Sequence, residues 1–229
     1  MNDVTRYFTA AARAALLAAA AMVLLAVRAG AADLPFEQAL ADVQQRWAEA
    51  NYQATGKSQK KAFDTLLDDA RALAAAHPKR AEALIWRGIV ASSYAGVKGP
   101  FGAMSLAREA KASLEAAKAL DAEALDGSAL TSLGVLYYKV PGGIIGFGDR
   151  DLARHYLKMA LALNPDGIDA NYFYGELMFE EEQYAEAKQA LLHALQAPPR
   201  PERPLADSGR RHEIAQLLER VNARLERSS

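Results

Sequence analysis

The chain has 229 residues and a formal net charge of -1, with 51% hydrophobic and 24% charged residues. This composition fits a folded protein of one or two domains with material for a core, and it excludes an intrinsically disordered chain. Because no basic excess is available to neutralise a phosphate backbone, the charge argues against a nucleic-acid partner. Alanine and leucine dominate and aromatic residues reach only 8%, so helix propensity predicts an all-α protein.

Residues 1–31 follow the pattern of a secretory signal peptide. Arg6 and Arg13 precede an uninterrupted apolar run over 14–27, and the small residues at 29–31 suit cleavage by signal peptidase. As a helix this run would rise about 21 Å, which is less than the roughly 30 Å hydrocarbon core. The pattern therefore predicts export rather than a permanent membrane span.

Arg28 is unusual between an apolar run and a cleavage site, and it leaves open an uncleaved anchor with the same domain outside the membrane. Removing residues 1–31 takes away Asp3 and three arginines, which leaves 24 basic and 27 acidic groups and a net charge of -3. The absence of cysteine excludes lipid attachment, disulfides and thiolate metal sites. We therefore expect a periplasmic protein, with a membrane contact only if the signal segment is retained.

Residues 32–229 are expected to form one helical domain. Its first helix pair covers 34–54 and 58–76. In the second of these helices, apolar side chains follow helical spacing at Phe63, Leu66, Leu67, Ala70 and Leu73.

Three later units share a spacing of small residues. In the last unit, Gly175 on a first helix is followed by Ala187, Leu191 and Ala194 on a second helix, and then by Pro199. The corresponding residues are Gly134, Ala153, Leu157, Ala160 and Pro165 in the unit before, and Gly88, Ala110, Leu114 and Ala117 in a unit that begins near Pro78. Glycine and alanine let two helices approach closely, leucine fills the space between them, and proline ends the second helix.

The last unit resembles the tetratricopeptide-repeat (TPR) pattern L-G…A-x3-F…P, with Tyr174 in place of the pattern's leucine and Leu191 in place of its phenylalanine. The resemblance extends over 34–199 as one well-matched repeat, two interrupted repeats and one degenerate repeat. It implies a TPR-like α-solenoid of about four helix pairs.

The residues after the repeats predict a cap. A Pro-rich connector is expected over 197–207, followed by a capping helix over 208–226 with Ser208 as its N-cap. One face of this helix is apolar and the opposite face is rich in arginine, as the end of a repeat array requires. The apolar residues are Ile214, Leu217, Leu218, Val221 and Leu225.

Two units carry extra residues between their helices. From the shared glycine to the first shared alanine, the last unit spans twelve residues, the unit before it nineteen, and the unit near Pro78 twenty-two. We therefore expect loop insertions over 95–104 and 139–149. Insertions at equivalent points of stacked repeats emerge on the same edge, so the two loops should touch. Either the loops bind a partner, or Phe101 and Phe147 plug them onto the helices while glycines supply the turns.

The glycines at 142, 143, 146 and 148 invite comparison with phosphate-binding loops. The spacing matches neither G-x-x-x-x-G-K-[ST] nor G-x-G-x-x-G after a strand. Gly148 is followed by Asp149, Arg150 and Asp151, and these carboxylates would repel a phosphate at the helix start. Asp149 or Asp151 is instead predicted to cap the helix that follows.

No enzyme signature is visible. The histidines lack metal-ligand spacing, no G-x-S-x-G motif is present, and the run Glu180-Glu181-Glu182 suits a solvated turn. We expect no catalytic residue, metal site or cofactor.

Binding candidates are aromatic and basic side chains of the two loops and of the groove that first helices form in a TPR stack. Aromatic rings offer contact area with a polar tip, although core packing is the commoner role for buried ones. Lysine and arginine near the loops could attract an anionic ligand. The candidates are Tyr94, Lys98, Phe101, Tyr137, Tyr138, Lys139, Phe147, Arg150 and Tyr172.

Among exported TPR proteins, the two insertions, the G-F-G-D sequence at 146–149 and the P-P-R…D-S-G tail are similar to the T-component family of TRAP transporters. Members of that family are often lipid-anchored, which a chain without cysteine cannot be. The resemblance implies an accessory protein that meets a periplasmic solute-binding protein and can bind a small molecule. Two functions are therefore expected: a non-enzymatic module that binds another periplasmic protein, or a small-molecule-binding accessory protein of a TRAP-type transport system whose loops close a cleft.

Overall fold

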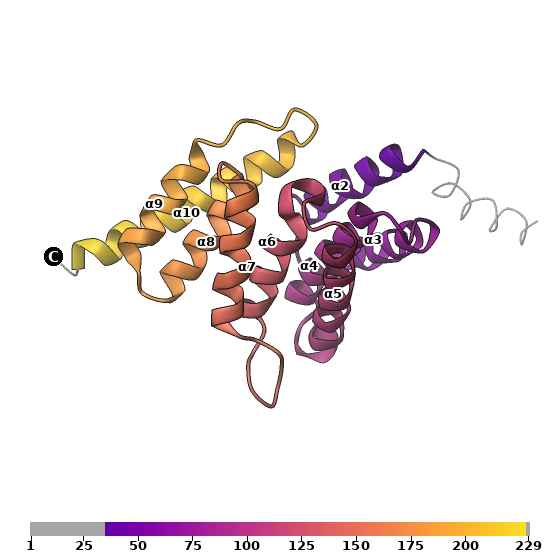
Figure 1. The fold of residues 1–229 in the computed structure, drawn as a ribbon, viewed down its shortest axis with the longest axis horizontal. Coiled ribbons are helices and arrows are strands. Elements are labelled where there is room, and N and C mark those ends of the chain that lie inside the picture. Colours follow the sequence, from indigo (N-terminus) through magenta and orange to yellow (C-terminus); the bar gives the residue numbers. More distant parts are fainter. Residues whose placement is uncertain (1–34, 228–229) are drawn as a thin grey trace, which may run out of the picture. The chain divides into compact units, whose positions relative to one another are not determined.

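The structure, a computed structural model, describes residues 35–227, except for the side chains of Pro100 and Phe101 (Figure 1). The predicted signal peptide at 1–31 lies outside the described residues. The described chain forms nine helices: α2 (Phe36–Tyr52), α3 (Gly56–Ala76), α4 (Ala81–Lys98), α5 (Pro100–Leu120), α6 (Ala124–Lys139), α7 (Arg150–Leu163), α8 (Ile168–Glu180), α9 (Tyr184–Leu195) and α10 (Pro204–Arg227). Between residues 35 and 227, the only β-pairing is an isolated bridge between Gly142 and Gly148. The all-α prediction is confirmed.

The chain divides into two compact units. The first ends at Ala39, and its described part is Pro35 with the first turn of α2, in which the amides of Gln38 and Ala39 donate to the carbonyl of Pro35 at 3.0 and 3.1 Å. The second unit begins at Leu40 and holds the remaining helices. None of the helices within 35–227 is long and apolar enough to cross a membrane.

In the second unit, consecutive helices pack as adjacent pairs: α4 with α5, α6 with α7, and α8 with α9. The α3 helix packs most extensively on α4 rather than on α2. Side chains join α2 to α3, since Arg46 pairs with Asp69 at 2.7 Å and the Gln59 amide donates to the Ala50 carbonyl at 3.1 Å. The arrangement of adjacent pairs follows the spacing of small residues in the sequence.

One close contact recurs in the three later pairs. A glycine on the first helix lies directly against a leucine of the second helix, so that a Cβ placed on the glycine would come within 2.5–2.8 Å of the leucine Cγ. These distances are shorter than real Cβ atoms tolerate, so only glycine permits this helix spacing. The pairs are Gly88 with Leu114, Gly134 with Leu157, and Gly175 with Leu191.

The predicted loop over 95–104 is wrong. The α4 helix continues to Lys98 and α5 begins at Pro100, so that Gly99 alone separates them. Gly99 has a φ of 93°, which breaks the helix without steric cost, and Pro100 occupies the first turn of α5, where its missing N–H is not needed. The extra residues therefore lengthen two helices. The second insertion does form a loop, over 140–149.

The C-terminal helix also starts earlier than the sequence predicts. The connector covers 196–203, and α10 begins at Pro204, so Ser208 lies inside the helix and is not its N-cap. Proline at the first helical position is favourable for the same reason as in α5. The apolar face is confirmed, since Ile214, Leu217, Leu218 and Val221 are buried. The opposite face is not uniformly solvated, because Arg210 is also buried.

The α10 helix does more than cover α9. It also packs on α8. At its N-terminal part, a Cβ placed on Gly209 would lie 2.4 Å from the Tyr52 ring, so this ring rests directly on the α10 backbone. The Tyr52 hydroxyl donates to Glu213 at 3.3 Å. The C-terminal helix therefore reaches from the last repeat back to the end of α2.

Replacing Gly134 with alanine should lower the free energy of unfolding by about 1–3 kcal/mol, because the added methyl group forces Leu157 or the two helices apart. Gly96 in α4 is the matched control, since nothing lies within 4 Å of a Cβ placed there. Gly96→Ala should raise the free energy of unfolding by roughly 0.5–1 kcal/mol, as expected for an uncrowded helical glycine. Urea unfolding followed by circular dichroism measures both changes, and equal effects at the two positions would contradict this account.

Candidate functional site

The second unit contains a groove of about 910 Å³. Its lining comes mainly from α4, α6 and α8, which are the first helices of three successive pairs. The start of α5, the turn before α8, the residues after α6, the connector over 196–203 and the beginning of α10 also contribute, together with two side chains of α2, Gln44 and Trp47. The groove therefore lies on the face that the repeat pattern predicts.

Small residues make the groove deep and aromatic residues give it apolar surface. Ser93 and Gly96 of α4, Ser132 of α6 and Ala170 of α8 leave space where longer side chains would fill it. Trp86 lies at the groove with only 2% of its surface exposed. A mostly apolar concavity with a few polar groups is the usual form of a binding site.

A left-handed turn borders the groove at the start of α6. Leu125, Asp126 and Gly127 have φ values of 50°, 55° and 74°, a region that disfavours residues other than glycine. The Ser128 hydroxyl donates to the Leu125 carbonyl at 2.5 Å and holds this turn. Leu125 and Asp126 both line the groove. Backbone strain of this kind is often retained at functional sites.

A charged cluster closes the end of the groove near the connector, and Asp169 is its centre. Asp169 accepts hydrogen bonds from Arg200 and Arg210, each at 2.8 Å. Arg200 also pairs with Asp207 at 2.6 Å, and its backbone N–H donates to the same carboxylate at 2.7 Å. These ion pairs fix the connector and the first turns of α10 against α8.

Burial alone would raise the pKa of Asp169, but the attraction of Arg210, Arg200 and Arg203 outweighs it, so the pKa lies well below its usual range. Arg210 is 7% exposed and lies 4.4 Å from the ring centroids of both Tyr172 and Phe173. Its guanidinium therefore combines an ion pair with cation–π contacts.

Arg203 differs from its neighbours. Its guanidinium carbon lies 5.1 Å from the ring centroid of Trp86, and both side chains line the groove. The Nε of Arg203 and the Nε1 of Trp86 are buried donors without a hydrogen-bond partner among the described residues. Such unpaired donors are rare in native interiors because each loses its hydration without compensation.

The residues predicted from sequence fall mostly outside this groove. Tyr94 stacks on Phe63 at 6.3 Å and donates to Asp64 at 2.8 Å. Lys98 donates to the Tyr94 hydroxyl at 2.6 Å and lies 3.8 Å from Asp64. These contacts tie α4 to α3, and the Lys98 charge already faces a carboxylate.

Tyr138, Lys139 and Arg150 are tied to two carboxylates of α8. The Tyr138 hydroxyl donates to Glu176 at 2.5 Å, and Lys139 pairs with Glu176 and Glu180 at 3.0 and 2.9 Å. Arg150 pairs with Glu180 at 3.2 Å. Of the eight predicted residues whose side chains are described, only Lys139 lines the groove, and its charge is already matched.

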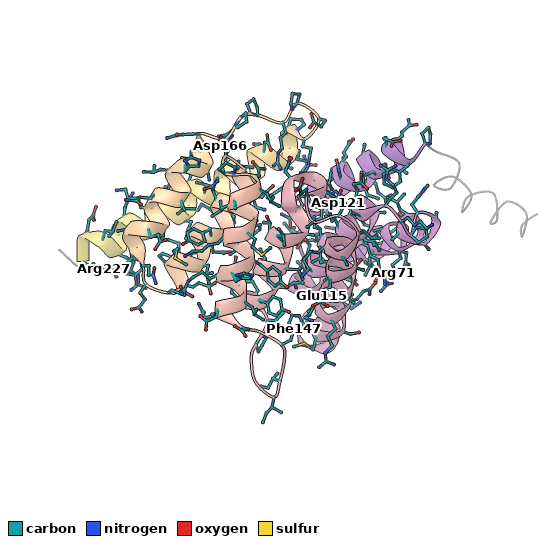
Figure 2. All side chains as sticks on the ribbon, in the orientation of Figure 1. Arg71, Glu115, Asp121, Phe147, Asp166 and Arg227 are labelled. Atoms are coloured by element: carbon teal, nitrogen blue, oxygen red, sulfur yellow. The ribbon has the colours of Figure 1, made fainter. Side chains whose placement is uncertain are left out.

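Tyr137 and Phe147 pack against each other at the base of the loop over 140–149, with ring centroids 5.8 Å apart. Figure 2 shows Phe147 at this base, at the end of the repeat helices opposite to Asp166. Lys111 of α5 lies 5.6 Å from the Phe147 ring centroid. The side chain of Phe101 is not described, so its predicted packing onto the helices stays a prediction. Tyr172 lies beneath Arg210, as described above, rather than in the groove lining.

Two glycines of this loop, Gly146 and Gly148, allow close packing. A Cβ on Gly148 would overlap the Val140 carbonyl, and one on Gly146 would overlap the Pro141 carbonyl. The predicted N-cap is confirmed, because Asp149 accepts hydrogen bonds from the backbone N–H groups of Asp151 and Leu152 at 3.0 Å. At the tip of the loop, Ile144 and Ile145 are 107% and 72% exposed.

The arginine cluster and the contact of Arg203 with Trp86 are not predicted by the sequence pattern. The signal available was three arginines, at 200, 203 and 210, within a short proline-rich tail. Their pairing with Asp169 and Trp86 joins segments far apart in the chain, and spacing does not reveal it. No group of three or more histidine, aspartate or glutamate side chains within 35–227 is arranged to hold a metal ion.

Replacing Asp169 with asparagine should lower the free energy of unfolding at pH 7 by about 2–3 kcal/mol, because Arg200 and Arg210 lose their shared counter-charge. Since the folded-state pKa of Asp169 is lowered, its contribution is present above the unfolded pKa of about 4 and is lost as the pH falls through the folded value. The difference between wild type and variant should therefore shrink below about pH 4.

Urea unfolding at several pH values measures this difference. Asp166 is the matched control, because its side chain is 74% exposed and its contact with His193 is on the surface. Asp166→Asn should change the free energy of unfolding by less than about 0.5 kcal/mol. A difference for Asp169→Asn that grows on acidification would show that the sign of the pKa shift is wrong.

Comparison with known proteins agrees with this architecture. Residues 145–204 match the tetratricopeptide repeat family model. The thermophilic TPR protein TTC0263 of Thermus thermophilus has a similar structure, with a TM-score of 0.53 and 19% identity over 80% of this chain and 87% of that protein. MamA is 20% identical over 75% of this chain and 94% of its own, with a TM-score of 0.43. The curated proteins include no match. The chain therefore has the helical-repeat fold of TPR proteins, and residues 145–204 match the repeat itself.

Proposed function

We propose that this protein is a non-enzymatic interaction module that binds a segment of a partner protein in the groove formed by α4, α6 and α8. The observation that carries the proposal is the groove itself, about 910 Å³ in volume and lined by the first helices of three consecutive pairs. Rigid helices hold these lining residues in place, so little order has to be created when a partner binds.

The lining also suits a peptide. Serine hydroxyls on α4 and α6 can exchange hydrogen bonds with a peptide backbone, while Trp86, Ile89 and Phe173 offer apolar contact. Buried aromatic residues beside arginine are the groups that most often dominate the binding energy of an interface.

We further propose that the partner is an exported protein. This part of the proposal rests on residues 1–31, whose basic start, apolar run and small residues match a signal peptide. The periplasm then provides the compartment, and a TRAP-type solute-binding protein is the partner that the sequence resemblance implies.

The loop over 140–149 is proposed as a second contact. Its base is fixed by Phe147 on Tyr137, while Ile144 and Ile145 at the tip are exposed. Contact with a partner would remove the apolar surface of these two isoleucines from water, which is favourable.

A small-molecule carrier is the second candidate function. The groove volume falls within the range of roughly 300–1,000 Å³ that is typical of small-molecule sites. Native mass spectrometry of protein purified from its host separates the two functions, because a carrier retains a ligand of constant mass and an interaction module does not.

Filling the groove tests the principal proposal. Ser132→Trp places a large ring at the middle of the groove lining and should abolish partner capture from host extract while the circular dichroism spectrum is unchanged. Lys158→Trp is the control, because Lys158 is exposed on α7 and does not line the groove. Undiminished capture by Ser132→Trp would overturn the proposal.

The loop contact has a separate test. The double variant Ile144→Ser, Ile145→Ser should lower the affinity for the same partner by about tenfold or more. Full burial of each isoleucine side chain contributes about 1.5–3 kcal/mol. The melting temperature should stay within about 2 °C, since neither side chain packs on the fold. If the double variant binds the partner as wild type does, the loop is only a connection.

A further inference from the structure

The groove contains two hydrogen-bond donors that the described protein does not satisfy, the Nε of Arg203 and the Nε1 of Trp86. The other tryptophan shows the contrast, since Trp47 Nε1 donates to the Ser93 hydroxyl at 2.9 Å. Trp47 and Trp86 are in edge contact, with ring centroids 5.8 Å apart, so one indole N–H is paired and its neighbour is not. Both unpaired donors belong to side chains that line the groove.

Arg203 is also exceptional in charge. The cations among the described lining residues are Lys139, Arg200, Arg203 and Arg210. Lys139 pairs with Glu176 and Glu180, Arg200 with Asp169 and Asp207, and Arg210 with Asp169 and Glu213. Within residues 35–227, Arg203 alone of the four makes no ion pair and no side-chain hydrogen bond.

The surroundings leave this charge uncompensated. Burial and the proximity of Arg200 lower the pKa of Arg203, and the more distant Asp169 and Asp207 offset this only in part. An anion that enters the groove would supply both the missing counter-charge and the missing acceptors.

We infer that Arg203 and Trp86 form a subsite for the carboxylate of an aspartate or glutamate side chain on the bound partner segment. This inference deepens the proposed function and rests on it. The guanidinium carbon lies 5.1 Å from the indole centroid, so the two side chains that carry the unpaired donors are neighbours in the groove lining. A carboxylate there can accept from the indole with one oxygen and from the guanidinium fork with the other. The arginine turns on its flexible stem to uncover the indole as the acidic side chain enters.

The rest of the groove limits the ligand to a single carboxylate. Asp126, Asp166 and Glu202 also line the groove and are exposed, so a phosphate or a polyacidic segment would meet like charges. An internal acidic residue of an extended segment matches the subsite without this repulsion.

The indole N–H resonances of the two tryptophans provide the readout, because the chain has only two. The probe is the peptide acetyl-Ala-Ala-Glu-Ala-Ala-amide, compared with its glutamine analogue and with the glutamine peptide that has a free C-terminal carboxylate. The Trp86 indole proton should move downfield with the glutamate peptide, while Trp47, already bonded to Ser93, should move little. The glutamine amide peptide should bind about tenfold more weakly.

Arg203→Met should lower the affinity for the glutamate peptide by about tenfold and leave the affinity for the glutamine amide peptide unchanged. Arg203→Lys, which keeps the charge but loses the fork, should recover part of the affinity. The matched control is Arg220→Met, because Arg220 lies 4.6 Å from the Phe179 ring centroid and does not line the groove. An unchanged Trp47 resonance shows that each variant is folded.

The inference fails if the Trp86 resonance does not respond to the glutamate peptide, if it responds equally to the glutamine amide peptide, or if Arg203→Met binds as wild type does. Stronger binding of the free-carboxylate peptide would also overturn it, since the subsite would then take a chain end. In each of these cases, loss of partner capture by Ser132→Trp would still support the proposed groove. Retained capture by that variant would instead remove the proposed function itself.

Discussion

The close approach of paired helices at Gly88, Gly134 and Gly175 is the contact on which the other features depend. At each site a leucine of the second helix fills the space that a side chain would need, and this fixes how near the two helices lie. Because the same spacing recurs in three consecutive pairs, their first helices line one continuous concavity. Small residues thus determine where a binding surface exists, although they do not contact a ligand.

Charge then organises one end of that concavity. Asp169 lies on α8, the first helix of the last pair, and it pairs with Arg200 of the connector and Arg210 of α10. These ion pairs hold a segment rich in proline and arginine against the repeats. The same fastening brings Arg203 over Trp86 without giving it a carboxylate. A structural ion-pair cluster and an unsatisfied cation are therefore parts of one arrangement.

The spacing of glycine, alanine and leucine predicted the helix pairs of the later repeats, because these contacts are between neighbouring helices and have a local signature. A glycine followed by a proline is compatible with a loop and equally with a junction between two helices. Gly99 and Pro100 form such a junction. The role of a residue on a first helix depends on which helical face its side chain occupies, and position along the helix alone does not reveal this. Arg203 with Trp86, and Asp169 with Arg210, are contacts across long sequence separations that no local pattern reports.

Repeat arrays commonly gain stability one neighbour at a time, so their terminal units fray independently. Here the Tyr52 ring rests on the backbone of Gly209, and its hydroxyl reaches Glu213, so the end of α2 touches α10, the helix that follows the repeats. Because α2 and α10 touch, unfolding of one of them removes contacts from the other. The two ends of the array are therefore coupled and do not fray independently. Amide hydrogen exchange in such a chain would be governed by shared rather than stepwise opening, which gives a short array the cooperativity of a globular domain.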